Sequence, residues 1–70
     1  MPTIDFHGCT VEEAVRDVNK LVDDARMDGA TYQCYFITGE GKIKQRLIEL
    51  LKNYGFRVFA KQGNLKVEIE

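Results

Sequence analysis

The feature that most constrains the fold of this chain is a long stripe of apolar residues in its first half. Between residues 11 and 25 these side chains recur at steps of three and four, the spacing that places them on one face of an amphipathic helix. Thr10 and Glu13 have the spacing of a capping box, and Gly29 is a typical left-handed terminator, so the sequence predicts a helix of about five turns between them. The stripe consists of Val11, Ala14, Val15, Val18, Leu21, Val22 and Ala25.

Further segments along the chain have the patterns of regular structure. A second apolar stripe predicts a helix over residues 43–54, which Gly55 ends. Four shorter runs either alternate between apolar and polar residues or are rich in aromatic and β-branched residues, as strands are. These strands are expected over residues 3–7, 31–37, 56–60 and 65–70, with a hairpin turn over residues 61–64.

This order of elements, β-α-β-α-β-β, defines the fold class. Each β-α-β unit should make a right-handed crossover, and two such crossovers in the same direction place both helices on one face of the sheet. The expected fold is therefore α/β, an α+β two-layer sandwich with a four-stranded sheet whose second face is open. The sequence contains no linker, repeat or low-complexity tract, so a single domain over residues 1–70 is expected.

The charge is close to neutral overall but unevenly distributed. Ten Lys and Arg against eleven Asp and Glu give a net charge of −1, which argues against a generally basic nucleic-acid binder. Residues 1–30 carry seven acidic and three basic side chains, whereas residues 31–70 carry four acidic and seven basic ones. This split is compatible with weak, salt-sensitive nucleic-acid binding through a few contacts in the second half. The charge count alone, however, favours solvated faces that keep a small domain soluble.

Several classes of protein are disfavoured by what the sequence lacks. No apolar run approaches the roughly 20 residues of a membrane span, and the first residues lack the pattern of a signal peptide, so a cytoplasmic protein without membrane contact is expected. Cys9 and Cys34 are expected to be free thiols in a reducing compartment. One histidine and two cysteines without a CxxC pair do not make a zinc site, so no metal ligands are predicted.

Two polar segments are expected at one edge of the sheet, where the carboxyl ends of parallel strands meet and where ligands of α/β proteins bind. The first contains Asp5 and His7, which would project on the same side of a strand, and a carboxylate beside an imidazole suits proton transfer. The second contains Gly39 and Gly41, which leave the backbone before a helix N-terminus open to a phosphate. A surface histidine and a common glycine turn are the alternatives, and Glu40 within the turn opposes an anion.

Basic and aromatic side chains supply further candidates. Lys42 and Lys44 follow the glycine turn and are candidates for additional phosphate contacts. On the open face of the sheet, alternation places aromatic side chains next to basic ones, a combination that stacks the bases of single-stranded nucleic acid. A dimer interface is the competing interpretation, so a monomer or a weak homodimer is expected. The residues concerned are Tyr35, Phe59, Arg57, Lys61 and Lys66.

Three motifs in order resemble those of the Smr (small MutS-related) domain family. Asp5-Phe6-His7-Gly8 resembles the family's Asp-Leu-His-Gly start, with Phe6 in place of the usual Leu. Thr10 with Glu13-Ala14 resembles its Thr-x-x-Glu-Ala helix opening, and Thr38-Gly39-Glu40-Gly41 resembles its Thr-Gly-x-Gly turn. The resemblance covers nearly the whole chain, although the late glycine-rich segment of many members is reduced to Gln62-Gly63-Asn64.

The resemblance implies a fold like the C-terminal domain of translation initiation factor three, in which the last strand is antiparallel and inserted between strands two and three. It also implies work on RNA or DNA, as an endonuclease or as a non-catalytic module that binds nucleic acid or the ribosome. By this resemblance Asp5 and His7 would be catalytic. A divalent ion, Mg²⁺ or Mn²⁺, is expected only for DNA nicking, because a 2′-hydroxyl nucleophile makes a metal dispensable for RNA. The family motifs and the basic side chains together give the expected nucleic-acid contacts. These are Gly8, Thr38, Gly39, Gly41, Lys42, Lys44, Arg57 and Lys61.

Overall fold

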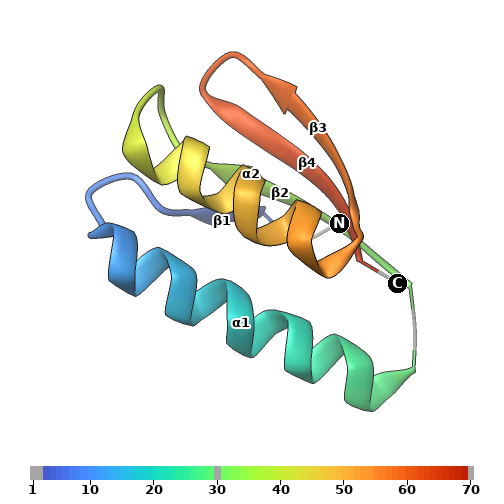
Figure 1. The fold of residues 1–70 in the computed structure, drawn as a ribbon. Helices are drawn as coiled ribbons and strands as arrows, with labels where there is room; N and C mark the ends of the chain where they lie inside the picture. The colour runs from blue at the N-terminus through green and yellow to red at the C-terminus, as the bar shows by residue number, and fades with distance from the viewer. Residues whose placement is uncertain (1–2, 30, 70) are drawn as a thin grey trace.

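The computed structural model describes residues 3–29 and 31–69, and it has the predicted order of elements (Figure 1). A four-stranded sheet forms one layer and two helices form the other, so the expected two-layer sandwich is confirmed. No helix within these described ranges combines the length and the apolar character needed to cross a membrane. The elements are β1 (Thr3–Asp5), α1 (Val11–Asp28), β2 (Tyr32–Ile37), α2 (Lys42–Tyr54), β3 (Arg57–Lys61) and β4 (Asn64–Ile69).

The sheet is mixed, with the strand order β1-β2-β4-β3. β1 runs parallel to β2, and β4 lies antiparallel between β2 and β3. The insertion of the last strand between the second and the third, which the family resemblance implied, is therefore confirmed. Because β1 and β2 are parallel neighbours, the loops that follow them begin at the same edge of the sheet.

Alternation along the strands separates a covered face from an open face. The covered face packs against both helices, and its core includes the rings of Phe6 and Phe36, which meet edge to face with centroids 5.3 Å apart. The two predicted apolar stripes supply the helix side of this core through residues such as Val18 and Leu47, both fully buried. The open face carries the alternate side chains of every strand, namely Thr3, Asp5, Gln33, Tyr35, Ile37, Arg57, Phe59, Lys61, Asn64, Lys66 and Glu68.

The two helices begin in different ways. α1 starts with a complete capping box, in which the Glu13 N–H donates to the Thr10 hydroxyl at 3.1 Å and the Thr10 N–H donates to the Glu13 carboxylate at 3.0 Å. These bonds hold the pKa of the Glu13 carboxyl below its ordinary value, and the bond from the backbone N–H of Thr10 has the largest effect. α2 starts at Gly41, with no side-chain cap and no acidic residue in its first turn. Both helices end at the predicted glycines, Gly29 and Gly55.

The boundaries of the strands differ from the prediction by one or two residues, and residue 70, the predicted end of the last strand, lies outside the described residues. β1 ends at Asp5 rather than at His7, because the Asp5 carboxylate accepts a hydrogen bond from the His7 backbone N–H at 2.8 Å and turns the chain. The last two strands are paired as far as Lys61 and Asn64, so the hairpin turn contains only Gln62-Gly63.

Candidate functional site

The loops that follow β1 and β2 leave the sheet at the same edge, as predicted (Figure 1). Asp5, the last residue of β1, lies opposite Ile37, the last residue of β2, and the Phe6 N–H donates to the Ile37 carbonyl at 2.8 Å. One loop leads into α1 and the other into α2. We refer to residues 5–10 and 38–42 together as the loop edge, which brings both candidate motifs into one place.

The first loop of this edge presents His7 to solvent. Its backbone N–H is held by the Asp5 carboxylate, and the turn is closed by a bond from the Cys9 N–H to the Phe6 carbonyl at 3.0 Å. Gly8 is also exposed. The prediction that Asp5 and His7 project side by side from one strand is wrong, because His7 lies in a turn. The carboxylate positions the backbone of His7, and no hydrogen bond joins it to the imidazole among the described residues.

The second loop presents the uncapped start of α2. Gly39 has a φ of +67°, a left-handed conformation that favours glycine, whereas Gly41 is extended. A Cβ atom at Gly41 would meet no atom within 4 Å. No side chain caps the first N–H groups of α2, and the side chain of Lys42 is exposed beside them. This local geometry is suited to an anion.

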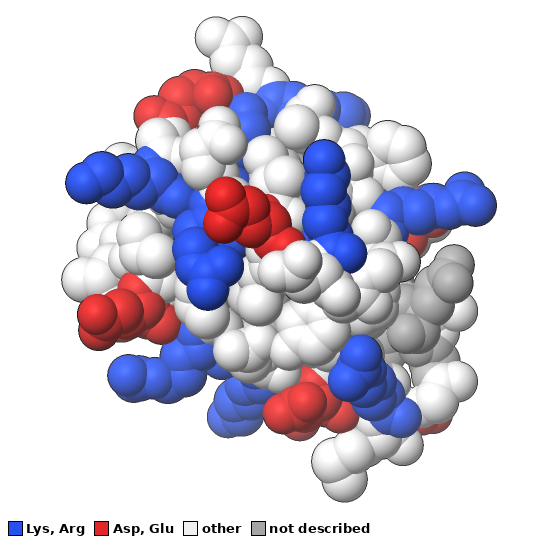
Figure 2. All heavy atoms as spheres, viewed as in Figure 1, with Lys and Arg blue, Asp and Glu red and all other residues white. Residues whose placement is uncertain are grey.

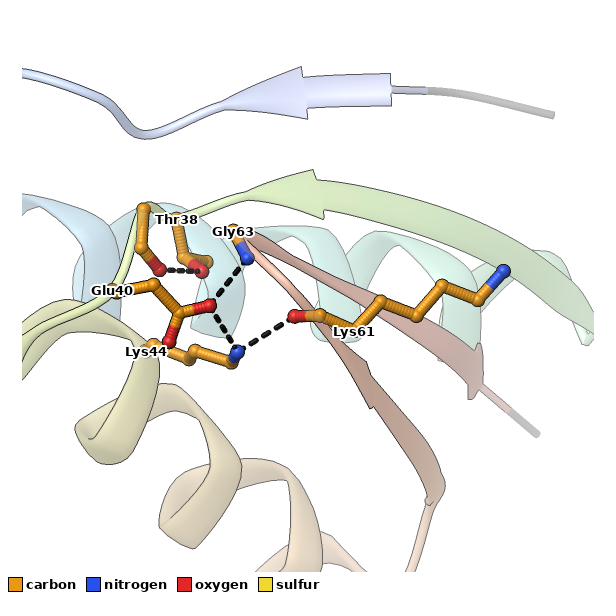
Figure 3. A network of polar contacts seen from close by, with 6 residues as sticks. Thr38, Glu40, Lys44, Lys61 and Gly63 are labelled. Carbon is orange, nitrogen blue, oxygen red and sulfur yellow. Dashed lines mark hydrogen bonds and ion pairs between the residues drawn. The ribbon is translucent and has the colours of Figure 1, made fainter.

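A polar network ties the second loop to the β3–β4 hairpin (Figure 3). One carboxylate oxygen of Glu40 accepts a hydrogen bond from the Lys44 ammonium at 2.8 Å and another from the Gly63 backbone N–H. The Lys44 ammonium also donates to the Lys61 carbonyl at 2.6 Å. We call these four residues the clasp, because they join two turns that are far apart in the chain.

Backbone hydrogen bonds between the loop before α2 and the hairpin turn reinforce the clasp. The Gly63 carbonyl accepts hydrogen bonds from the N–H groups of Thr38 and Gly39, at 3.1 and 3.0 Å. The Thr38 side chain is buried, and its hydroxyl donates to the Gly39 carbonyl at 3.1 Å. The expected nucleic-acid contact through the Thr38 side chain is therefore corrected, because this side chain packs inside the protein and supports the turn.

The clasp also changes the roles of Lys44 and Glu40. Lys44 is only 8% exposed and its ammonium is bonded on two sides, so it is not placed for the phosphate contact expected from its position in the sequence. The bond from Lys44, with that from the Gly63 N–H, lowers the pKa of the Glu40 carboxyl. Glu40 is thus paired with a cation rather than opposing an anion in the turn. Sequence reasoning missed this network, of which only the i, i+4 spacing of Glu40 and Lys44 is visible in the sequence.

The predicted aromatic and basic surface lies on the open face of the sheet. Tyr35, Lys66 and Phe59 form one row across β2, β4 and β3. The Lys61 ammonium lies 5.8 Å from the centroid of the Tyr35 ring, within the range of a cation–π interaction. Arg57 and Lys61 are both exposed on β3, the edge strand on the far side of the sheet from β1. Their side chains therefore belong to the open face, whereas the backbone carbonyl of Lys61 belongs to the clasp.

The surface seen in the view of Figure 1 is mixed in charge. Figure 2 shows Lys and Arg side chains interleaved with Asp and Glu rather than gathered into one basic patch. A shallow groove with a volume of about 380 Å³ lies between the start of α1 and α2. Basic, acidic and apolar side chains all contribute to this groove, which is lined by Val11, Lys42, Gln45, Arg46 and Glu49.

The two cysteines are free thiols, as predicted. Cys34 is buried in the core, and burial raises the pKa of its thiol. A thiol that stays protonated is a poor nucleophile, so Cys34 acts as a packing residue. Cys9 is half-buried in the first loop.

Comparison with known proteins identifies relatives of the whole chain. The family model described as the Smr domain matches residues 4–64. A crystal structure of a human small-MutS related domain is similar to this chain, with a TM-score of 0.66 and 32% sequence identity. The match covers 93% of this chain and 96% of the human one. No curated protein matches the chain.

Proposed function

The chain belongs to the Smr domain family, and from this premise we propose that it is an endonuclease-type domain that binds and cleaves nucleic acid at the loop edge. Smr domains are generally associated with nucleic acids. The observation that carries the proposal is that the exposed His7 and the uncapped start of α2 follow neighbouring parallel strands. A phosphate at this edge would meet a proton-transfer group and backbone N–H donors together.

The start of α2 is the proposed phosphate site. Its first N–H groups carry the positive end of the helix dipole, and neither a capping side chain nor an acidic residue competes for them. Gly41 leaves the space in front of these groups open, and Gly39 supports the turn that leads to them. Lys42 and the exposed Gly8 on the other loop complete the proposed contacts. Lys44 holds the loop in place from inside and is not assigned to the phosphate.

His7 is the proposed general acid or base. With RNA, the imidazole accepts the proton of a 2′-hydroxyl, whose oxygen attacks the adjacent phosphorus while the bond to the 5′-oxygen breaks. The leaving 5′-oxygen takes up a proton from water, and the imidazolium returns its own proton to water. This step yields a 2′,3′-cyclic phosphate and a 5′-hydroxyl. Asp5 is a positioning residue, because its carboxylate accepts a hydrogen bond from the backbone N–H of His7. This bond fixes the backbone from which the imidazole side chain extends.

DNA has no 2′-hydroxyl, so nicking would require an activated water and, as expected from the sequence, a divalent ion such as Mg²⁺ or Mn²⁺. Within residues 3–29 and 31–69, no group of three or more His, Cys, Asp or Glu side chains is gathered into a site that would hold a metal ion by protein ligands alone. A divalent ion here would be held largely by the phosphates of the substrate, and no step is assigned to one. We propose RNA as the substrate, because its 2′-hydroxyl supplies the nucleophile.

A second candidate function is binding without cleavage. The observation in its favour is that the hydrogen bond of the Asp5 carboxylate goes to a backbone N–H, so that no described carboxylate orients the imidazole of His7. In this case the loop edge would hold a phosphate through α2 and Lys42, and His7 would be a surface residue of the turn.

Cleavage assays with a matched variant separate the two candidates. Purified protein is incubated with end-labelled single-stranded RNA and with supercoiled plasmid, each with and without EDTA. We expect RNA cleavage that resists EDTA and leaves a cyclic phosphate. We expect His7→Gln, which keeps a polar side chain but cannot titrate, to lose cleavage by about 100-fold or more while it still binds RNA.

Three results of these assays would contradict the catalytic proposal. Retained binding without cleavage under any condition would establish the second candidate. Equal cleavage by the wild type and His7→Gln would remove His7 from the mechanism. Plasmid nicking that depends on added Mg²⁺ or Mn²⁺, without RNA cleavage, would replace the 2′-hydroxyl chemistry with a metal-dependent one.

A further inference from the structure

The open face of the sheet carries a row of aromatic and basic side chains next to the loop edge. Tyr35, Lys66 and Phe59 are neighbours in register across three strands. Adjacent strands lie about 4.8 Å apart, so the two aromatic residues begin about 10 Å from each other with the lysine between them. Such an arrangement offers two ring faces and a cation to one ligand.

The open face also exposes large apolar side chains to solvent. Among the described residues, the large hydrophobic side chains exposed to solvent are Met27, Ile37 and Phe59. Two of these three lie on the open face, where Phe59 is 46% exposed and Ile37 is 40% exposed. The open face therefore presents two of these three exposed apolar side chains to solvent.

This surface is continuous with the loop edge. Asp5 lies opposite Ile37 in register, and Ile37 is two residues from Tyr35 on the same side of β2. The row of Asp5 and Ile37 continues through Asn64 to Lys61, which is the row nearest to the loops. A nucleic-acid strand whose phosphate binds at the loop edge therefore reaches the row of Tyr35, Lys66 and Phe59, which is the next row away from the loops.

The charges on the open face favour an anionic partner near its centre. The cations beside the aromatic rings are Lys61 and Lys66, and the Lys61 ammonium already lies over the Tyr35 ring. A third cation, Arg57, lies opposite Glu68, which offsets its charge. The other acid of the face, Asp5, is occupied by the backbone N–H of His7. By contrast, α1 carries six acidic and three basic side chains and would repel a polyanion.

We infer that the open face is a stacking platform for the unpaired bases of single-stranded nucleic acid, which it holds while the loop edge engages a phosphate. This inference rests on the proposed function and adds its substrate class. Phe59 supplies the main stacking surface, and Tyr35 supplies a second one when the Lys61 ammonium moves from the ring to a phosphate. Bases in a duplex are stacked on each other and cannot lie flat on these rings, so the platform selects single strands.

Fluorescence anisotropy with labelled oligonucleotides tests the inference. The probes are oligouridylate, oligothymidylate and duplex RNA and DNA, bound to protein that also carries His7→Gln so that RNA is not consumed. Phe59→Leu keeps the apolar bulk but removes the ring, and we expect it to weaken binding of both single strands by about 5- to 10-fold. Phe59→Tyr restores the ring and should bind like the parent. Lys66→Gln should also weaken binding, unlike the matched control Lys20→Gln, which removes an exposed charge from α1.

The possible failures are distinguishable. If the parent binds single strands and Phe59→Leu binds them equally well, the platform is wrong while the proposed function stands. A preference for duplexes over single strands also overturns the platform. If light scattering shows a dimer that Phe59→Leu or Tyr35→Ser disrupts, the open face is an interface between copies of the chain. If the parent binds none of the probes, the proposed function fails and the platform fails with it.

Discussion

Gly39 and Gly41 flank the same glutamate in the second loop, yet they make different demands on the backbone. Gly39 has a φ of +67°, which an L-residue with a Cβ adopts at a cost of about 1–2 kcal/mol. Gly41 is extended, a conformation open to any residue, and a Cβ there would point into empty space. One glycine is therefore needed to form the turn, whereas the backbone does not require the other, which we propose keeps the front of α2 accessible.

This difference predicts that alanine at Gly39 mainly lowers the stability, whereas alanine at Gly41 mainly weakens binding and cleavage. Gly39→Ala should lower the free energy of unfolding by about 1–2 kcal/mol in a urea titration. Gly41→Ala should lower it by less than about 1 kcal/mol, but should weaken RNA binding and cleavage several-fold because its methyl group stands where the phosphate approaches. If Gly41→Ala leaves binding and cleavage unchanged, the phosphate does not lie at the start of α2.

At the scale of elements, the clasp joins the loop before α2 to the hairpin between β3 and β4. Glu40 and Lys44 supply the charged part of this contact, and Gly63 supplies the backbone on the hairpin side. The loop edge is thus held by a hairpin that comes later in the chain and lies outside both loops of the edge. Its stability depends on the ionised form of Glu40, since the pKa of this carboxyl is lowered chiefly by the bond from Lys44.

The lowered pKa of Glu40 predicts a pH-dependent contribution to stability. A carboxyl with a depressed pKa in the folded state stabilises the fold above its ordinary pKa of about 4.3, and this contribution is lost as the pH falls through the folded-state value. Glu40→Gln should therefore be less stable than the wild type at pH 7, and the difference should shrink in acid. Thermal unfolding at several pH values measures it.

Glu49→Gln is the matched control for this prediction. Glu49 also pairs with a basic side chain on α2, Arg46, but at 3.9 Å and on the exposed surface, so its substitution should change the stability little at either pH. A stability difference for Glu40→Gln that stays the same from neutral to acid pH would show that the charge of Glu40 does not support the clasp.

At the scale of the whole molecule, a net charge of −1 is compatible with nucleic-acid binding because the acidic and basic side chains are unevenly divided among the elements. α1 carries most of the acidic side chains, whereas the cations proposed for binding lie at the start of α2 and on the open face. The number of such cations is small, namely Lys42, Lys61 and Lys66, with Arg57 partly offset by Glu68. Binding should therefore be electrostatic, local and modest in strength.

This distribution predicts a shallow dependence of binding on salt. Each phosphate contact with a single strand contributes about −0.7 to the slope of log K against log salt concentration, so three or four contacts give a slope of about −2 to −3. Anisotropy titrations across a range of KCl concentrations measure this slope. A slope near zero would mean that the cations do not contact phosphates, and a slope steeper than about −5 would require a basic surface that these residues do not supply.

The sequence alone was sufficient for the elements, the fold class and the place of the candidate edge. The apolar stripes, the capping box of Thr10 and Glu13 and the terminal glycines are patterns among residues a few positions apart, and such patterns act on the local backbone before any distant contact forms. The placement of two polar loops at one edge follows from the parallel pairing of consecutive strands.

Only the tertiary structure decided which of the predicted site residues are exposed and which are buried. Lys44 and Thr38 are directed inward because their partners, the Lys61 carbonyl and the Gly63 turn, come from a hairpin about twenty residues away in the chain. Alternation predicts Tyr35, Lys66 and Phe59 on one face, but their register as one row depends on how β4 pairs with β2 and β3. Contacts of this kind depend on where separate elements meet in space, and the periodicity of a single segment carries no information about that meeting.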